Sequence, residues 1–179
     1  MLIALTLIMG LLVLICPFIL YRSTEPQRFN RQVHAVLLVW VGVTLLLTLG
    51  FREFDEKLSY NLNLFQCYRG LANQISYNWR TYRFSYNAEQ FKIISTGICN
   101  ILLNIIMFMP YGYLMPELFS KRSFCLQKIL LIGIIITLFI EMMQLVTHRG
   151  CFDLDDIFHN TLGVLLGYAL GHYAVRGKY

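Results

Sequence analysis

Charged side chains are scarce in this chain of 179 residues. Asp, Glu, Lys and Arg make up 14% of the sequence, while hydrophobic residues make up 57%; an ordinary soluble domain carries roughly 25% charged residues. The sequence also lacks a phosphate-binding P-loop, a glycine-rich dinucleotide turn, a Gly-x-Ser-x-Gly motif and a Cys-x-x-Cys pair. These absences exclude a soluble domain of usual composition and argue against soluble cofactor chemistry.

Long apolar segments take the place of the missing charge. A membrane-spanning helix needs roughly 20 mainly apolar residues. Five segments reach about that length: 2–21, 33–51, 97–118, 127–148 and 156–175. We therefore expect an all-α, polytopic membrane bundle with five transmembrane helices, which forms a single domain over residues 1–179 and has the lipid bilayer as its surroundings.

The positions of Lys and Arg predict how the chain is oriented. Basic residues are concentrated in three short segments: Arg22, Arg28 and Arg31; Lys121, Arg122 and Lys128; and Arg176 and Lys178. By the positive-inside rule, this face is cytoplasmic. We expect a multi-pass protein with its N-terminus outside and its C-terminus in the cytoplasm. A cleaved signal peptide is disfavoured, because the first segment has no basic start and no small-residue cleavage site.

The connection over residues 52–96 is long and rich in aromatic residues mixed with polar ones. Amphipathic rings favour the headgroup region, so we expect an extracellular loop on the outer surface of the membrane. Asn87 and Gln90 resemble a capping box, which predicts a short interfacial helix that leads into the third span. Covering the helix ends and forming a binding platform both remain open roles. A nucleic-acid partner is not expected, because acids alternate with the basic residues.

Polar residues gather in one short stretch, residues 141–160, which covers the end of the fourth apolar segment, the turn after it and the start of the fifth. They are Glu141, Gln144, His148, Arg149, Asp153, Asp155, Asp156, His159 and Asn160. Unpaired polar groups in hydrocarbon cost several kcal/mol, so groups that persist there are usually paired or functional. Function is therefore best sought in this hairpin.

Helix periodicity brings some of these groups together. Asn100 and Asn104 share one face of the third predicted span, and Glu141 and Gln144 share one face of the fourth. On the expected topology Glu141 lies roughly 10 Å deep, at 1.5 Å per residue. Asp156 of the fifth predicted span is expected at the same depth in the membrane. We expect an outward-facing polar pocket between Asn104, Glu141 and Asp156.

Three glycines in the last predicted span repeat every four residues: Gly163, Gly167 and Gly171. Small residues at this spacing let two helix backbones approach closely in a membrane. Packing within the chain is the favoured interpretation, and an oligomer formed through this face is the alternative.

Three ordered motifs resemble those of VanZ-like membrane proteins. They are Asn104-Ile105-Ile106-Met107-Phe108-Met109-Pro110-Tyr111-Gly112, then Glu141-Met142-Met143-Gln144, then Arg149 followed by Asp153-Leu154-Asp155-Asp156-Ile157-Phe158-His159-Asn160-Thr161-Leu162-Gly163. The resemblance covers roughly residues 57–172. It implies a protein of the bacterial cytoplasmic membrane and cell envelope, in a family named for a protein associated with low-level teicoplanin resistance, an antibiotic-resistance phenotype.

The resemblance also implies motif positions: Asn61, Asn104, Glu141, Gln144, Arg149, Asp153, Asp156 and Asn160. The chain departs from the family pattern near the first of these. Leu64 replaces the proline of the Asn-Leu-x-Pro-Phe element, Leu58 stands where an arginine is usual, and Val164 replaces a second glycine. These departures leave the shape of the loop open.

Three kinds of function remain open. The first is an enzyme that acts on an envelope lipid or lipid-linked precursor. Its catalytic groups would be Glu141 and Asp156, its substrate-binding groups Asn61, Asn104, Gln144, Arg149 and Asn160, and its ligands for Mg²⁺ or Ca²⁺ Asp153 and Asp156. Capping of a helix N-terminus is the alternative role for Asp153 and Asp155.

The second function is a non-catalytic accessory or interaction protein, in which Glu141 and Arg149 form a buried pair. The third is a transporter or lipid flippase, disfavoured because the sequence has no evident internal repeat. One disulfide among Cys67, Cys99 and Cys151 is also left open.

Overall fold

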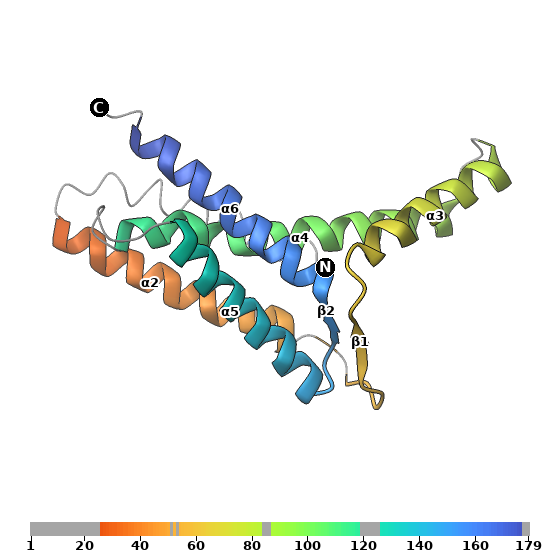
Figure 1. The fold of residues 1–179 in the computed structure, drawn as a ribbon, viewed down its shortest axis with the longest axis horizontal. Helices are drawn as coiled ribbons and strands as arrows, with labels where there is room; N and C mark the ends of the chain where they lie inside the picture. The colour runs from red at the N-terminus through yellow and green to blue at the C-terminus, as the bar shows by residue number, and fades with distance from the viewer. Residues whose placement is uncertain (1–25, 51, 53, 84–86, 119–125, 177–179) are drawn as a thin grey trace.

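The computed structural model describes residues 26–50, 52, 54–83, 87–118 and 126–176, and this part of the chain is mostly helical. Figure 1 shows a bundle of crossing helices from which one helix leads away. The elements of the bundle are α2 (Pro26–Leu45), which continues as the π-helical turn η1 (Leu46–Gly50), α4 (Ala88–Leu118), α5 (Leu126–Val146) and α6 (Leu154–Arg176). The predicted span at 2–21 lies outside the described residues.

Three helices in the described part are long and apolar enough to cross a membrane: Arg31–Gly50, Ala88–Pro116 and Leu126–Val146. The predicted segment 156–175 does form a helix, α6. It does not join the three, because His159, Asn160 and His172 reduce its apolar character. A helical membrane architecture is thus supported, whereas five transmembrane helices are not confirmed.

Close backbone contact joins α4 to α6. A β-carbon built on Gly163 would overlap the carbonyl oxygen of Ile105, and one built on Gly167 would overlap that of Met109. Only glycine permits this approach. The glycine face of α6 therefore packs against α4 within the same chain.

Trp40 packs α2 against α4. Its ring centroid lies 5.6 Å from that of Phe108 and 5.5 Å from that of Tyr111. Its indole Nε1 donates a hydrogen bond of 2.6 Å to the Met107 carbonyl. Because a buried indole needs a hydrogen-bond acceptor, this bond helps to select the position of α2 against α4.

Two short strands lie at one end of the bundle, and a further helix starts beside them. Strand β1 (Ser59–Asn61) pairs in parallel with β2 (Cys151–Asp153), with Asn61 opposite Asp153. Helix α3 (Gln66–Tyr82) follows β1 and leads away from the bundle (Figure 1). The Gln90 N–H donates to the Asn87 side chain at 3.0 Å, so Asn87 caps α4. The helix that begins there continues without a break into the membrane-spanning segment.

Candidate functional site

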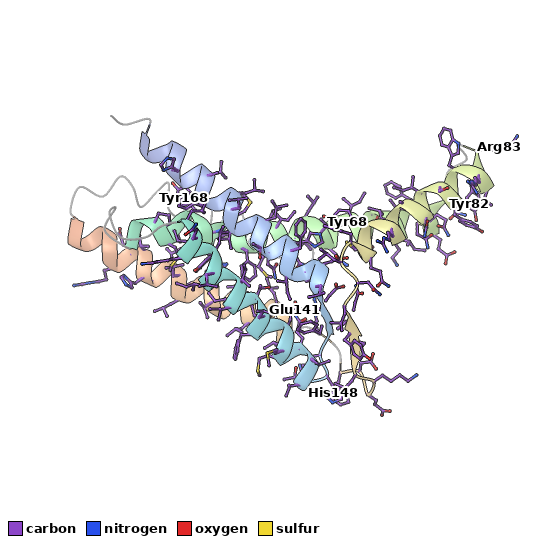
Figure 2. All side chains as sticks on the ribbon, viewed as in Figure 1. Tyr68, Tyr82, Arg83, Glu141, His148 and Tyr168 are labelled. Carbon is purple, nitrogen blue, oxygen red and sulfur yellow. The ribbon has the colours of Figure 1, made fainter. Side chains whose placement is uncertain are left out.

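Glu141 stabilises the turn between α5 and α6 through a hydrogen bond to the backbone of Asp153. This side chain is 2% exposed, and its Oε2 accepts the Asp153 N–H at 3.0 Å. Figure 2 shows Glu141 on α5 and His148 in the turn that follows. His148 has a φ of 55°, the left-handed conformation that reverses the chain after α5. Glu141 thus holds the strand that carries Asp153, and the turn returns that strand to the level of Glu141.

Asp153 is fixed by hydrogen bonds from both sides. Its Oδ1 accepts Asn61 Nδ2 at 3.0 Å and the Asp155 N–H at 2.8 Å. Burial raises the pKa of Asp153, and these two hydrogen bonds lower it without cancelling the effect of burial. Asn61 therefore acts on the Asp153 carboxylate from the neighbouring strand.

Asp155 links α6 to the beginning of α3. Its carboxylate accepts the backbone N–H of Phe65 and, at 2.8 Å, that of Cys67. Burial raises the pKa of Asp155, but the hydrogen bonds from Cys67 and Phe65 together bring it below its ordinary value. The negative charge also lies at the favourable end of the α3 dipole. The Asp155 side chain thus caps the N-terminus of α3, although it belongs to α6.

A polar chain connects α4, α6 and α3. Asn104 Nδ2 donates to Asp156 Oδ1 at 2.5 Å, and the same oxygen lies 4.0 Å from His159 Nδ1. The other ring nitrogen of His159, Nε2, is hydrogen-bonded to the Tyr68 hydroxyl at 2.8 Å. His159 is 1% exposed, and its Nδ1 has no hydrogen-bond partner. This arrangement leaves a buried imidazole nitrogen beside a carboxylate.

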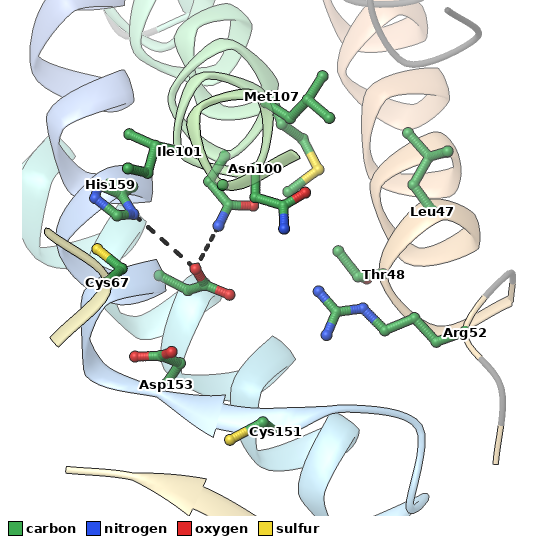
Figure 3. A pocket seen from close by; sticks show the side chains of 14 residues that line it. Leu47, Thr48, Arg52, Cys67, Asn100, Ile101, Met107, Cys151, Asp153 and His159 are labelled. Carbon is green, nitrogen blue, oxygen red and sulfur yellow. Dashed lines mark hydrogen bonds and ion pairs between the residues drawn. The ribbon is translucent and has the colours of Figure 1, made fainter. Parts of the chain in front are cut away.

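Four of these residues, Asn104, Asp153, Asp156 and His159, border a cavity of about 470 Å³. Its lining residues are Leu47, Thr48, Arg52, Cys67, Gly97, Asn100, Ile101, Leu103, Asn104, Met107, Cys151, Asp153, Asp156 and His159. Figure 3 shows Arg52 reaching into it from the end of η1, across from Asp153, with Asn100 and Met107 above. Charged and amide side chains thus alternate with aliphatic ones around the cavity. Its volume is that of a small-ligand site.

Not all of the predicted site residues line the cavity, and Asn61 only reaches it through its hydrogen bond to Asp153. Asn104, Asp153 and Asp156 line the cavity. Glu141, Gln144 and Asn160 are buried outside its lining. Gln144 Nε2 donates to the Thr48 carbonyl at 3.3 Å, and Asn160 Nδ2 donates to Thr137 Oγ1 at 2.6 Å.

Arg149 lies elsewhere. It is exposed, and it borders a second hollow of about 700 Å³ together with Arg52 and Lys57. Its guanidinium donates to the Leu49 carbonyl at 3.2 Å. The structure therefore does not show the buried pair with Glu141 that was considered from the sequence.

Sequence reasoning did not assign Arg52, His159 or Tyr68 to the site. The sequence offered a reason to consider Arg52, because it is the first charged residue after the second apolar segment. His159 also carried a signal, because it belongs to the polar stretch over residues 141–160. Tyr68 carried none, because it meets His159 only through the fold. Cys67, Cys99 and Cys151 are free thiols. Burial raises the pKa of Cys67 to about 12 and also raises that of Cys151.

Carboxylates are close to one another here, but they are not arranged as a cage. In the part of the chain that the structure describes, no three His, Cys, Asp or Glu side chains are grouped so that they could hold a metal ion. Asp155 is turned toward α3, and the Oδ1 atoms of Asp153 and Asp156 accept amide donors. The Mg²⁺ or Ca²⁺ site at Asp153 and Asp156 stays a prediction.

Comparison with known proteins identifies a family for this chain. The family model described as VanZ/LLP1 matches residues 1–175. No curated protein and no solved structure matches the chain detectably. The resemblance first seen in the motifs is confirmed, and it extends beyond them to nearly the whole sequence. With its apolar helices, the chain is a membrane protein that belongs to the VanZ/LLP1 family.

Proposed function

We propose that the cavity binds the polar headgroup of a phosphate-bearing envelope lipid or lipid-linked precursor, on the outer side of the bacterial plasma membrane. The observation that carries this proposal is the mixed lining of the cavity, which presents charged, amide and apolar side chains to the same space. Arg52 faces Asp153 across the space, while Leu47, Ile101 and Met107 supply apolar surface beside them. A headgroup attached to a hydrocarbon chain needs both kinds of surface.

Four polar residues of the cavity lining would contact the headgroup in this proposal: Arg52, Asn100, Asp153 and Asp156. The Arg52 guanidinium presents a planar set of donors that matches phosphate oxygens. Asn100 can donate to or accept from hydroxyl and amide groups, and the oxygens of Asp153 and Asp156 can accept from hydroxyl or ammonium groups. The pocket thus suits a headgroup that combines an anionic phosphate with hydrogen-bond donors.

The orientation proposed for the chain connects this site with resistance. The concentration of basic residues in the three short segments described above supports an outward-facing cavity. Binding or modifying an envelope lipid there would alter the surface that a glycopeptide meets. Resistance to teicoplanin is therefore the phenotype that we propose to follow.

Whether the bound lipid is also modified depends on His159 and Asp156. A buried imidazole beside a carboxylate, with Nδ1 unbonded, is suited to accept or deliver a proton. The second candidate function is a non-catalytic accessory protein. It is favoured by the hydrogen bonds of Glu141 and Gln144, because both side chains bind backbone groups of the same chain and not the cavity. Transport or lipid flipping has no comparable support.

Lipid bound to the purified protein provides the test. The full chain would be extracted in mild detergent, and co-purifying lipids would be identified by native mass spectrometry. We expect phosphate-bearing lipids on the wild type and their loss from Arg52→Gln. Lys57→Gln is the matched control, because Lys57 borders the neighbouring hollow and not the cavity. Equal lipid occupancy in Arg52→Gln and the wild type would contradict the proposal.

A second comparison separates binding from modification. Asp156→Asn keeps an oxygen that can accept from Asn104 but cannot act as a base. If the site is catalytic, this variant retains the lipid and loses the resistance phenotype. If the protein is an accessory factor, it retains both.

A further inference from the structure

We propose that α3 is a membrane-surface helix that rests its aromatic face on an anionic phospholipid surface beside the cavity. The first observation is its exposure. None of its 17 residues is buried, although the helix is amphipathic. Figure 2 shows it as an arm with side chains on all sides, from Tyr68 near the bundle to Tyr82 and Arg83 at the far end.

One face of α3 is apolar and aromatic. Tyr68, Leu71, Ile75, Trp79 and Tyr82 recur at intervals of three or four residues, so they form one stripe along the helix. Ile75 is 49% exposed and Trp79 is 61% exposed. Exposed aromatic rings on one face of a helix are typical of the membrane–water interface, where the ring body is apolar and its edge is polar.

The charge of α3 points to the kind of surface that it meets. Arg69 and Arg80 lie on the helix and Arg83 follows it as the C-cap, while residues 66–83 contain no Asp or Glu. A net positive arm is attracted to anionic phospholipid headgroups. A second copy of this chain would bring the same positive charge to the contact, so electrostatics disfavours self-association through α3.

The fold holds the near end of this arm in place. Asp155 accepts the backbone N–H groups of Phe65 and Cys67, and His159 is hydrogen-bonded to Tyr68. Near the same end, Leu71 faces Gly97 of α4. Tyr68 and Leu71, at the near end of the stripe, thus contact the helices that line the cavity and set the direction of α3. The part of the stripe proposed to meet the lipid is farther out, where Ile75 and Trp79 are exposed.

Trp79 supplies a direct probe, because the chain contains only two tryptophans. The Trp40→Phe variant would be reconstituted in vesicles of phosphatidylcholine alone or mixed with phosphatidylglycerol, each with and without brominated acyl chains. We expect brominated lipid to quench Trp79 and lipid to shield it from acrylamide, both more strongly in the phosphatidylglycerol vesicles. Because Trp40 is a core residue, the difference between the wild type and Trp79→Phe gives the same signal in an unaltered core.

Charge variants test the electrostatic part. Arg69→Gln/Arg80→Gln should lower the equilibrium constant for docking on the anionic surface by about 30-fold, from about 1 kcal/mol per arginine. Lys57→Gln, which removes a charge outside α3, should change nothing.

Three results would overturn the proposal. The first is full acrylamide access to Trp79 without quenching by brominated lipid. The second is equal quenching in both vesicle compositions. The third is shielding of Trp79 that depends on protein concentration and appears with energy transfer between labelled copies, because that result assigns the face to a second chain.

Discussion

The Asp155 carboxylate accepts the backbone N–H of Cys67 at 2.8 Å, although the two residues lie 88 positions apart. One residue at the start of α6 therefore fixes the start of α3. The same turn of α6 carries Asp156, whose carboxylate lines the cavity. The candidate binding site and the arm beside it thus share one short segment of backbone.

Asp155→Ala should release the N-terminus of α3. The loss of hydrogen bonds to a charged acceptor is expected to cost about 1.5–3 kcal/mol. Alkylation of the Cys67 thiol, followed by peptide mass spectrometry, should become faster because the surrounding contacts loosen. Asp55→Ala is the control, since the Asp55 carboxylate accepts a local N–H in an exposed segment. Unchanged Cys67 labelling in Asp155→Ala would contradict this role.

The pH dependence of the α3 attachment follows from the lowered pKa of Asp155. Its pKa in the folded protein lies below the ordinary value of 3.8. The stabilisation is therefore fully present above about pH 4 and is lost as the pH falls through the folded pKa. Hydrogen exchange at the Phe65 and Cys67 amides, corrected for intrinsic rates, should show falling protection in acid. Asp155→Asn should remove that pH dependence.

Asp153 should change the pH dependence of stability in the direction opposite to that of Asp155. Its pKa is raised in the folded protein, mainly by burial, so its protonated form is favoured by folding. That contribution is present below the unfolded pKa and is lost as the pH rises through the raised folded pKa. In Asp153→Asn this dependence should disappear, and the loss of amide protection in acid should become steeper than in the wild type. A shallower acid response would be inconsistent with the raised pKa.

Gly167→Ala should separate α4 from α6. The added methyl group would overlap the Met109 carbonyl oxygen, and overpacking of this kind costs about 1–3 kcal/mol. Gly42→Ala is the matched control, because a β-carbon at Gly42 meets nothing within 4 Å. Thermal unfolding in detergent should show a lower midpoint for Gly167→Ala alone. Equal midpoints would mean that the two backbones do not approach so closely.

Glu141 should behave as a positioning residue. Glu141→Gln keeps an oxygen that can accept the Asp153 N–H, so we expect it to fold and to retain the bound lipid. Glu141→Ala leaves that N–H without its partner and should lower stability by about 1–3 kcal/mol. Lipid occupancy and thermal unfolding of both variants provide the measurements. Loss of lipid in a stably folded Glu141→Gln variant would instead place Glu141 in the binding chemistry.

Much of the site was accessible from sequence because polarity in an apolar helix is conspicuous. The motifs around Asn104 and Asp156 marked residues that the fold joins by a hydrogen bond. The same argument grouped them with Glu141, Gln144 and Asn160, which lie outside the cavity lining. Burial of a polar group signals a partner, and for these three residues the structure supplies partners within the fold.

The sequence by itself determined the class of the molecule, because apolar length and scarce charge leave few alternatives to a helical membrane protein, and its ordered motifs indicated the family. Only the tertiary structure decided which polar groups meet. Arg52 reaches the cavity from the end of η1, and Tyr68 meets His159 across 91 positions. Helix periodicity specifies which side chains share a face. It does not specify which neighbouring helix that face meets, because packing between helices selects the neighbour.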